Sequence, residues 1–179
     1  TSGAYNTAMG AYALRYNRSG AYNTASGYYS LRHNSTGNSN VAIGVASLYS
    51  NTDRSNLVAI GDSALYNNGY GAAVGNDDAT ANIAVGSKAL YNNTTGNHNV
   101  GIGSESLYHT IAGNENTAIG YQAGWGNGGY GQNASGGVYI GYQAGSLNSS
   151  SNRLFIDNSS TYYPLIGGDF SVDRVDING

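Results

Sequence analysis

The side chains best suited to binding chemistry are aromatic residues that recur at one place in a repeated sequence. A motif of the form Asn-x-Ala-x-Gly, with looser copies, runs along most of the chain. In five copies the residue five positions after the glycine is aromatic: Tyr49, Tyr66, Tyr91, Tyr108 and Trp125. Exposed rings offer stacking surfaces to a sugar or a protein partner. The pattern therefore predicts a receptor-binding row or, alternatively, a structural stack or a seam between subunits.

Catalytic and metal-binding chemistry has little support. No column of the repeat holds a recurring acid, base or nucleophile, so we expect no catalytic residue and no enzyme activity. The chain has no cysteine, and its three histidines lie far apart in the repeat frame. Asp77 and Asp78 could offer oxygen ligands to Ca²⁺, but adjacent acids in an Asn/Gly-rich turn are usually solvated. We therefore predict no metal and no cofactor.

The composition excludes several classes of protein. Of 179 residues, 28 are Gly and 17 are Tyr, only 9% are charged, and the formal net charge is −3. One Lys and six Arg give no basic patch for nucleic acid. The chain has no long apolar run that would predict a membrane span and no leader that would predict secretion. Its abrupt start within a repeat suggests that it is a piece of a longer protein. This composition fits a disordered tract or an ordered repeat.

Regular spacing favours the ordered repeat. Nine glycines close copies of the motif, and five of the eight intervals between them are 17 residues. The interval from Gly61 to Gly86 is irregular, and we expect a tighter coil or an offset there. The glycine-rich stretch 125–137 lengthens a later interval and predicts a protruding loop. The nine glycines are Gly10, Gly27, Gly44, Gly61, Gly75, Gly86, Gly103, Gly120 and Gly141.

Each repeat has the pattern of a short strand, a glycine bend, a second short strand or bend, and a turn. Before the glycine, β-branched residues flank a small one, which predicts a strand with its apolar face inside and its Ala face outside. A Leu four residues after the glycine should return to the same interior, and an Asn seven residues after it should lie in a turn. The predicted core ladder is Val41, Ile43, Leu48, Ile60, Leu65, Val85, Leu90, Ile102, Leu107, Ile119 and Ile140.

These units predict an all-β fold, a parallel β-roll or β-solenoid of about nine coils. No single coil can bury a core, so neighbouring coils must stack at ~4.8 Å spacing and share one. Residues 1–151 are predicted to form the β-roll repeat domain. Residues 152–179 lack the period and predict a C-terminal β cap or junction segment of two or three strands, because an open solenoid end exposes strand edges.

Several repeats resemble a known family. The segments NVAIGVASL, NLVAIGDSAL, NIAVGSKAL and NTAIGYQAG look like the head repeats of trimeric autotransporter adhesins, the YadA-like β-roll, and like related repeats of phage and phage-derived tail fibres. The similarity covers roughly residues 5–147, although the family's usual coil is shorter than 17 residues. The segment LFIDNSSTYYPLIGGDFSVDRVDING resembles those that precede endosialidase-type intramolecular chaperone domains.

The resemblance implies a left-handed, homotrimeric, extracellular roll on a cell surface or virion fibre. Its function would be non-catalytic attachment to a host or surface receptor, with a glycan among the candidates. We expect no nucleic-acid partner and no membrane insertion. Two alternatives stay open: an ice-binding β-solenoid, which thermal hysteresis would reveal, and a polysaccharide-degrading tailspike, which would release reducing sugar.

Overall fold

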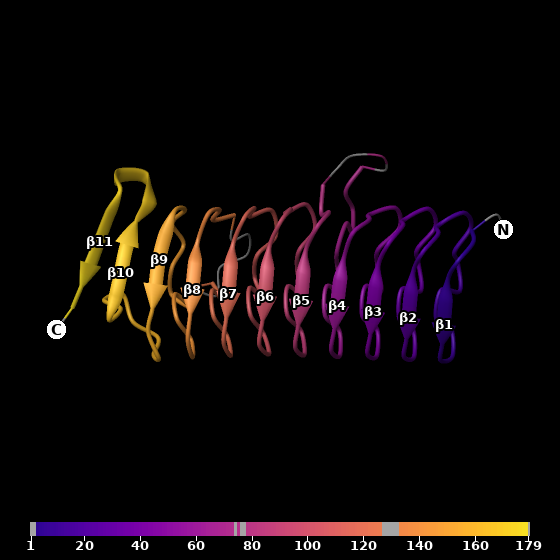
Figure 1. The fold of residues 1–179 in the computed structure, drawn as a ribbon, viewed down its shortest axis with the longest axis horizontal. Helices are drawn as coiled ribbons and strands as arrows, with labels where there is room; N and C mark the ends of the chain where they lie inside the picture. The colour runs from indigo at the N-terminus through magenta and orange to yellow at the C-terminus, as the bar shows by residue number, and fades with distance from the viewer. Residues whose placement is uncertain (1–2, 74, 76–77, 127–132, 179) are drawn as a thin grey trace.

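The chain forms a parallel β-solenoid, as predicted, in a computed structural model that describes residues 3–73, 75, 78–126 and 133–178 (Figure 1). Within these residues, the solenoid has about eight turns, each contributing one three-residue strand to a single sheet. The strands are β1 (Thr7–Met9), β2 (Thr24–Ser26), β3 (Val41–Ile43), β4 (Val58–Ile60), β5 (Ile83–Val85), β6 (Val100–Ile102), β7 (Thr117–Ile119) and β8 (Val138–Ile140).

Equivalent residues of successive repeats lie beside one another in the sheet. Ile43 pairs with Ile60, and Ile102 pairs with Ile119. The stacking of near-identical rungs is therefore confirmed. The ninth expected coil is absent from the described sheet, because β4 pairs directly with β5 and the copy ending at Gly75 contributes no strand between them.

The prediction of which strand face lies inside is wrong. The central alanines, such as Ala42 and Ala59, are fully buried, whereas Ile43 is 41% exposed. The reason is the thinness of the coil, since the leucines opposite the strand fill the interior and leave room there only for Ala. The predicted core residues that instead face outward, exposed or half-buried, are Val41, Ile43, Ile60, Val85, Ile102, Ile119 and Ile140. Those buried as predicted are Leu48, Leu65, Leu90 and Leu107.

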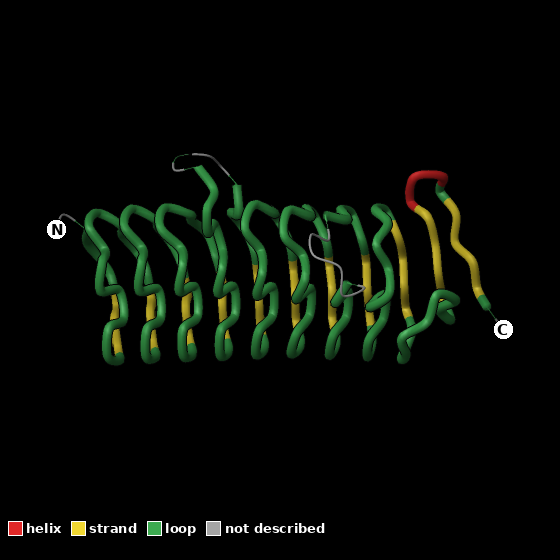
Figure 2. The backbone as a smooth tube through the Cα atoms, turned by 180° about the vertical axis from the view of Figure 1, so that it is seen from behind, coloured by secondary structure: helices red, strands yellow, loops and turns green. Residues whose placement is uncertain are grey.

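After the glycine, the chain returns through turns, which is the bend that the sequence offered as the alternative to a second short strand. Figure 2 shows these return segments passing in front of the strands. In each regular coil, the residues two and four positions after the glycine have left-handed backbone, as in Ala46 (φ 52°) and Leu48 (φ 51°). Left-handed geometry costs an L-residue roughly 1–2 kcal/mol. Burial of the Leu and ladder bonds such as Leu48 N to Ala64 O, 3.0 Å, offset that cost.

Several of the asparagines predicted to occupy turns are also buried, and they join neighbouring coils. Asn34 and Asn51 are fully buried, and the Asn51 amide donates to the Asn34 side-chain oxygen over 3.1 Å. A second Asn column, mostly buried, directly precedes most of the strands. The two columns converge, since the carbonyl of Gly37 accepts from Asn23 (2.8 Å) and from Asn34 (2.9 Å). These ladders satisfy buried backbone groups that a small apolar core leaves without partners.

The irregular interval from Gly61 to Gly86 adds residues at one corner of the coil, just before the strand. The Asn51 amide reaches a carbonyl three residues ahead, that of Arg54, whereas the Asn68 amide reaches one eleven residues ahead, that of Ala79. The described residues of this corner insertion (69–73, 75 and 78) lie at the upper edge of the rod between β4 and β5 (Figure 1). The predicted loop at 125–137 falls in the next lengthened coil, where residues 127–132 lie outside the described part of the chain.

The C-terminal segment continues the sheet and then reverses it. Strand β9 (Arg153–Ile156) pairs in parallel with β8, and β10 (Ile166–Asp169) and β11 (Arg174–Ile177) follow antiparallel, joined by the 3₁₀ turn η1 (Phe170–Val172). Tyr139 and Phe155 occupy the interior place that Ala holds in earlier coils. The sheet thus runs through the predicted boundary at residue 151. None of the described residues form a helix long and apolar enough to cross a membrane.

Candidate functional site

The outward side of the sheet, which we call the sheet face, is from β3 onward an array composed mostly of Val and Ile. The isoleucines that end five of these strands each leave more than a third of the side chain exposed, from 37% at Ile60 and Ile140 to 41% at Ile43 and Ile119. The first residue of each strand lies on the same face, since side chains two apart in a strand point the same way. Aligned apolar exposure of this extent is typical of an interaction surface, whereas single exposed apolar residues are not.

The opposite side of the rod, the return face, carries the aromatic row. The five rings form one continuous stack, with centroids 4.9 Å apart for Tyr49–Tyr66, 5.1 Å for Tyr66–Tyr91 and 5.3 Å for Tyr91–Tyr108. Tyr108 and Trp125 continue it at 6.4 Å. The structure therefore brings the sequence-predicted aromatic residues together and leaves them half-buried.

The stack changes what these rings can offer to a ligand. Within the row each ring lies nearly parallel to the next, for example at 4° between Tyr49 and Tyr66, so its faces are occupied by its neighbours. A ligand on this row would therefore meet ring edges and tyrosine hydroxyls in place of ring faces. Burial, reinforced by neighbouring tyrosines, raises the pKa of Tyr66, so that hydroxyl stays a protonated donor at neutral pH. Sugar stacking on the faces of Tyr49, Tyr66, Tyr91, Tyr108 and Trp125 loses support, while binding through their edges stays a prediction.

Towards the N-terminus the same column changes from aromatic to cationic. Arg15 and Arg32 precede Tyr49 in it, and the Arg32 guanidinium donates to the Tyr49 hydroxyl over 2.6 Å. The Arg32 guanidinium carbon lies 4.5 Å from the Tyr29 ring centre, and that of Arg15 lies 4.8 Å from the Tyr12 ring centre. The sequence places both arginines in the column, but cation–π packing is visible only in the structure.

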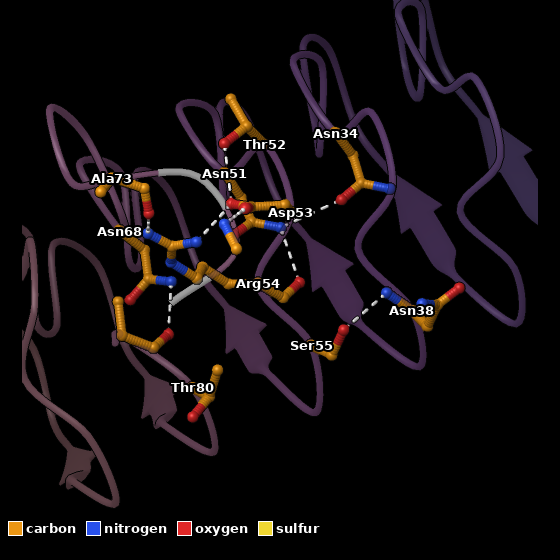
Figure 3. Close-up of polar contacts among 12 residues, drawn as sticks. Asn34, Asn38, Asn51, Thr52, Asp53, Arg54, Ser55, Asn68, Ala73 and Thr80 are labelled. Carbon is orange, nitrogen blue, oxygen red and sulfur yellow. Dashed lines mark hydrogen bonds and ion pairs between the residues drawn. The ribbon is translucent and has the colours of Figure 1, made fainter. Parts of the chain in front are cut away.

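The corner insertion is held to the rod by a buried ion pair that sequence reasoning missed (Figure 3). Arg54 occupies a place that is Gly in most coils, and its side chain is 1% exposed. It contacts Asp53 at 2.5 Å and donates to the Ala73 carbonyl over 2.9 Å. Asp53 in turn accepts from the backbone N–H of Gly75 over 2.7 Å. The only sequence signal is the break of the Gly column, a large charged residue where others are small.

The cap contains a hollow of about 530 Å³ between β9, β10 and β11. Arg153 and Arg174 line it, together with Tyr162 and Pro164. Both arginines are already paired, Arg153 with Asp169 at 3.1 Å and Arg174 with Asp176 at 3.0 Å. The hollow therefore has little cationic character left for a ligand.

In the described part of the chain, no three His, Asp or Glu side chains lie close enough together to hold a metal ion. Asp77, one of the two acids considered as Ca²⁺ ligands, lies outside the described residues. His33 packs edge-on against Tyr49, and burial, with a smaller effect from the charge of Arg32, lowers its pKa. His33 is therefore a neutral part of the aromatic surface.

No family description, curated protein or solved structure matches this chain.

Proposed function

We propose that the chain is a non-catalytic, rod-shaped attachment module that associates with two further copies through the sheet face and presents the return face to a receptor. The aligned outward row of Ile43, Ile60, Ile102, Ile119 and Ile140 carries the proposal. A lone rod leaves this row in water, whereas closed symmetric association would bury it along the whole rod.

The division of the surface supports the same reading. On the return face, the row from Tyr49 to Trp125 is covered by its own ring stacking, so this row depends less on another copy than the sheet face does. The return face carries the aromatic row and the arginines that pack on tyrosine rings, and such side chains suit recognition better than assembly. The resemblance of the sequence to trimeric adhesin and fibre repeats supports this division of roles by analogy. A location on a cell surface or a virion is part of the proposal.

The oligomeric state tests the assembly. One chain has a mass of 18.5 kDa, so light scattering coupled to size exclusion should give about three times that value. Replacing both Ile43 and Ile102 with Ser should shift the mass to one chain, because it places hydroxyls in the apolar seam. Tyr70→Ser is the matched control, since Tyr70 is 68% exposed on the corner insertion. A monodisperse wild-type monomer would remove the main support for the proposal.

The ice-binding alternative has one observation in its favour, a flat and regular outward face. Thr7, Thr24 and Thr117 do stand in one column of that face, but Val or Ile occupies most of its other places. A regular hydroxyl array is therefore lacking. Thermal hysteresis of the purified chain at millimolar concentration would favour this alternative over attachment.

A further inference from the structure

The arginines of this chain fall into two groups that differ in their partners. Beyond residue 52, every arginine is ion-paired: Arg54 with Asp53, Arg153 with Asp169 and Arg174 with Asp176. Before residue 53 the sequence has three arginines, Arg15, Arg18 and Arg32, and no Asp or Glu at all. Among the described residues, no ion pair involves any of these three. The N-terminal coils therefore hold cations without counter-charges.

The charge of the rod is correspondingly divided. Residues 1–52 carry three arginines and no acid, a formal charge of +3 with histidine neutral. Residues 53–179 carry four Lys or Arg against ten Asp or Glu, a formal charge of −6. An anion is thus attracted to the first coils and repelled by the remainder of the rod.

Two of the unpaired arginines are brought together on the return face. Arg15 and Arg32 occupy the same column in successive coils, and their guanidinium carbons lie 5.3 and 5.5 Å from the centre of the same ring, that of Tyr16. Two like charges that flank one ring repel each other, and an anion bound beside that ring would offset the repulsion. The five cation–π contacts found among the described residues all involve these two arginines.

The rings around them hold the guanidinium groups in place while leaving donors free. A guanidinium over a ring uses its face for the contact, and its N–H groups lie in its plane, available to a planar carboxylate. Arg32 uses one nitrogen on the Tyr49 hydroxyl, and its Nε is buried, so only its remaining terminal N–H groups can serve a ligand. The side chain of Arg15 makes no hydrogen bond within the described residues. Arg15 is exposed, so its donors are accessible.

The same surface offers apolar ring area beside the cations. Tyr12, Tyr16 and Tyr28 are each about half exposed, at 46, 44 and 45%. A saturated sugar ring can lie against such tyrosines while an attached carboxylate accepts from a guanidinium. His33 stacks on Tyr16 with centroids 5.2 Å apart and adds a neutral imidazole at the edge.

From this combination we infer that the patch formed by Tyr12, Arg15, Tyr16, Tyr28 and Arg32 is a binding site for an acidic saccharide, a sugar that carries a carboxylate. A nucleic acid is the less suitable anion, because a long phosphate backbone would meet the acidic remainder of the rod. The inference deepens the proposed attachment function by naming the chemistry of the receptor. The patch lies within one chain, so it does not depend on trimer formation.

Calorimetric titration tests this site, with tetragalacturonate as the probe and maltotetraose as the neutral probe of the same length. We expect tetragalacturonate to bind at least about tenfold more tightly than maltotetraose, as a charge-assisted bidentate contact would give. The double replacement Arg15→Gln with Arg32→Gln should weaken tetragalacturonate binding by about tenfold or more. Arg174→Gln, which removes an exposed arginine from the cap, should change the affinity by less than about twofold.

Two further measurements keep the test decisive. Arg15→Gln alone should also weaken binding, and because Arg15 is exposed, its circular dichroism should match the wild type. The Ile43→Ser, Ile102→Ser double variant should bind tetragalacturonate with unchanged affinity per chain, which separates this site from assembly. Absence of tetragalacturonate binding, equal binding of maltotetraose, an equal loss in Arg174→Gln, or tighter binding of a single-stranded DNA oligonucleotide would each overturn the inference.

Discussion

The two long faces of this rod arise from the same repeat, but they differ in how far the stacked side chains cover one another. On the sheet face, stacking places Ile over Ile and leaves each side chain more than a third exposed. On the return face, stacking places Tyr over Tyr and lets each ring cover the next at about 5 Å. Flat rings can lie face to face at the coil spacing and cover one another, whereas an aliphatic side chain contacts its neighbours along the sheet and keeps its outward surface in water.

This difference assigns different consequences to mutations on the two faces. A side chain that is covered by its neighbours in the stack should contribute to the stability of the single chain. A side chain that the stack leaves exposed should contribute to stability mainly when another molecule covers it.

The largest effect should come from the glycine that joins the two faces. In Gly44 the backbone has φ +125°, and an added Cβ would lie 2.5 Å from the Gly61 carbonyl oxygen. Gly44→Ala should destabilise the chain by about 3 kcal/mol or more, since the coil must open or strain. Urea unfolding followed by circular dichroism measures this. Gly71→Ala is the control, because Gly71 also has positive φ (+75°) but open space around it, and it should cost only about 1 kcal/mol.

Truncation on the two faces should separate them directly. Leu90→Ala, at a fully buried residue of the return segment, should cost about 3 kcal/mol through lost burial and a cavity. Ile102→Ala, at a side chain 39% exposed, should cost less than about 1 kcal/mol in dilute solution. Unfolding curves at two protein concentrations measure both. Similar losses for the two variants at low concentration would contradict the outward placement of Ile102.

The aromatic stack should contribute a smaller, local term. Tyr91 contacts rings on both sides, so Tyr91→Leu should cost about 1–2 kcal/mol. Tyr142 stacks on one neighbour, Tyr121, at 5.5 Å and is 48% exposed, so Tyr142→Leu should cost about half as much or less. Thermal unfolding of the two variants compares them. A loss at Tyr142 equal to that at Tyr91 would argue against a cooperative stack.

The smallest effect should be a pH dependence confined to the return face. Burial lowers the pKa of His33 and of His109 below their ordinary value of 6.5. The unfolded chain therefore binds these protons more readily than the folded chain does, and stability should fall as pH decreases through about 6.5. Thermal unfolding between pH 7.5 and 5.5 should show this slope, and His33→Gln with His109→Gln should reduce it. A slope unaffected by both replacements would assign it to other groups.

Much of the fold was predictable because one spacing recurs. The 17-residue interval and the β-branched columns located the strands, and the recurring Leu located the buried residue of the return segment, as at Leu48 and Leu107. The copy at Gly75 was misjudged as a coil. This copy has the small and apolar residues of the motif, but β4 pairs directly with β5 and leaves no place for a strand between them.

The inner and outer faces of the strand could not be distinguished by alternation. A pattern such as Val41-Ala42-Ile43 places two apolar residues on one side and a small residue on the other, and either side can face a core. The decision depends on how closely the return segment approaches, which is a property of the assembled coil. The Arg54–Asp53 pair was missed for the same reason, because a charged residue in a loop-like stretch of sequence gives no sign that it is buried.

By itself, the sequence determined that the chain must stack, because no single repeat holds enough apolar surface to fold alone and identical letters recur at a constant interval. Only the tertiary structure decided which side chains the stack encloses. Enclosure depends on the few ångströms between strand and return segment, where Ala fits and Ile does not, and on left-handed turns at residues such as Leu48 that bring leucine inward.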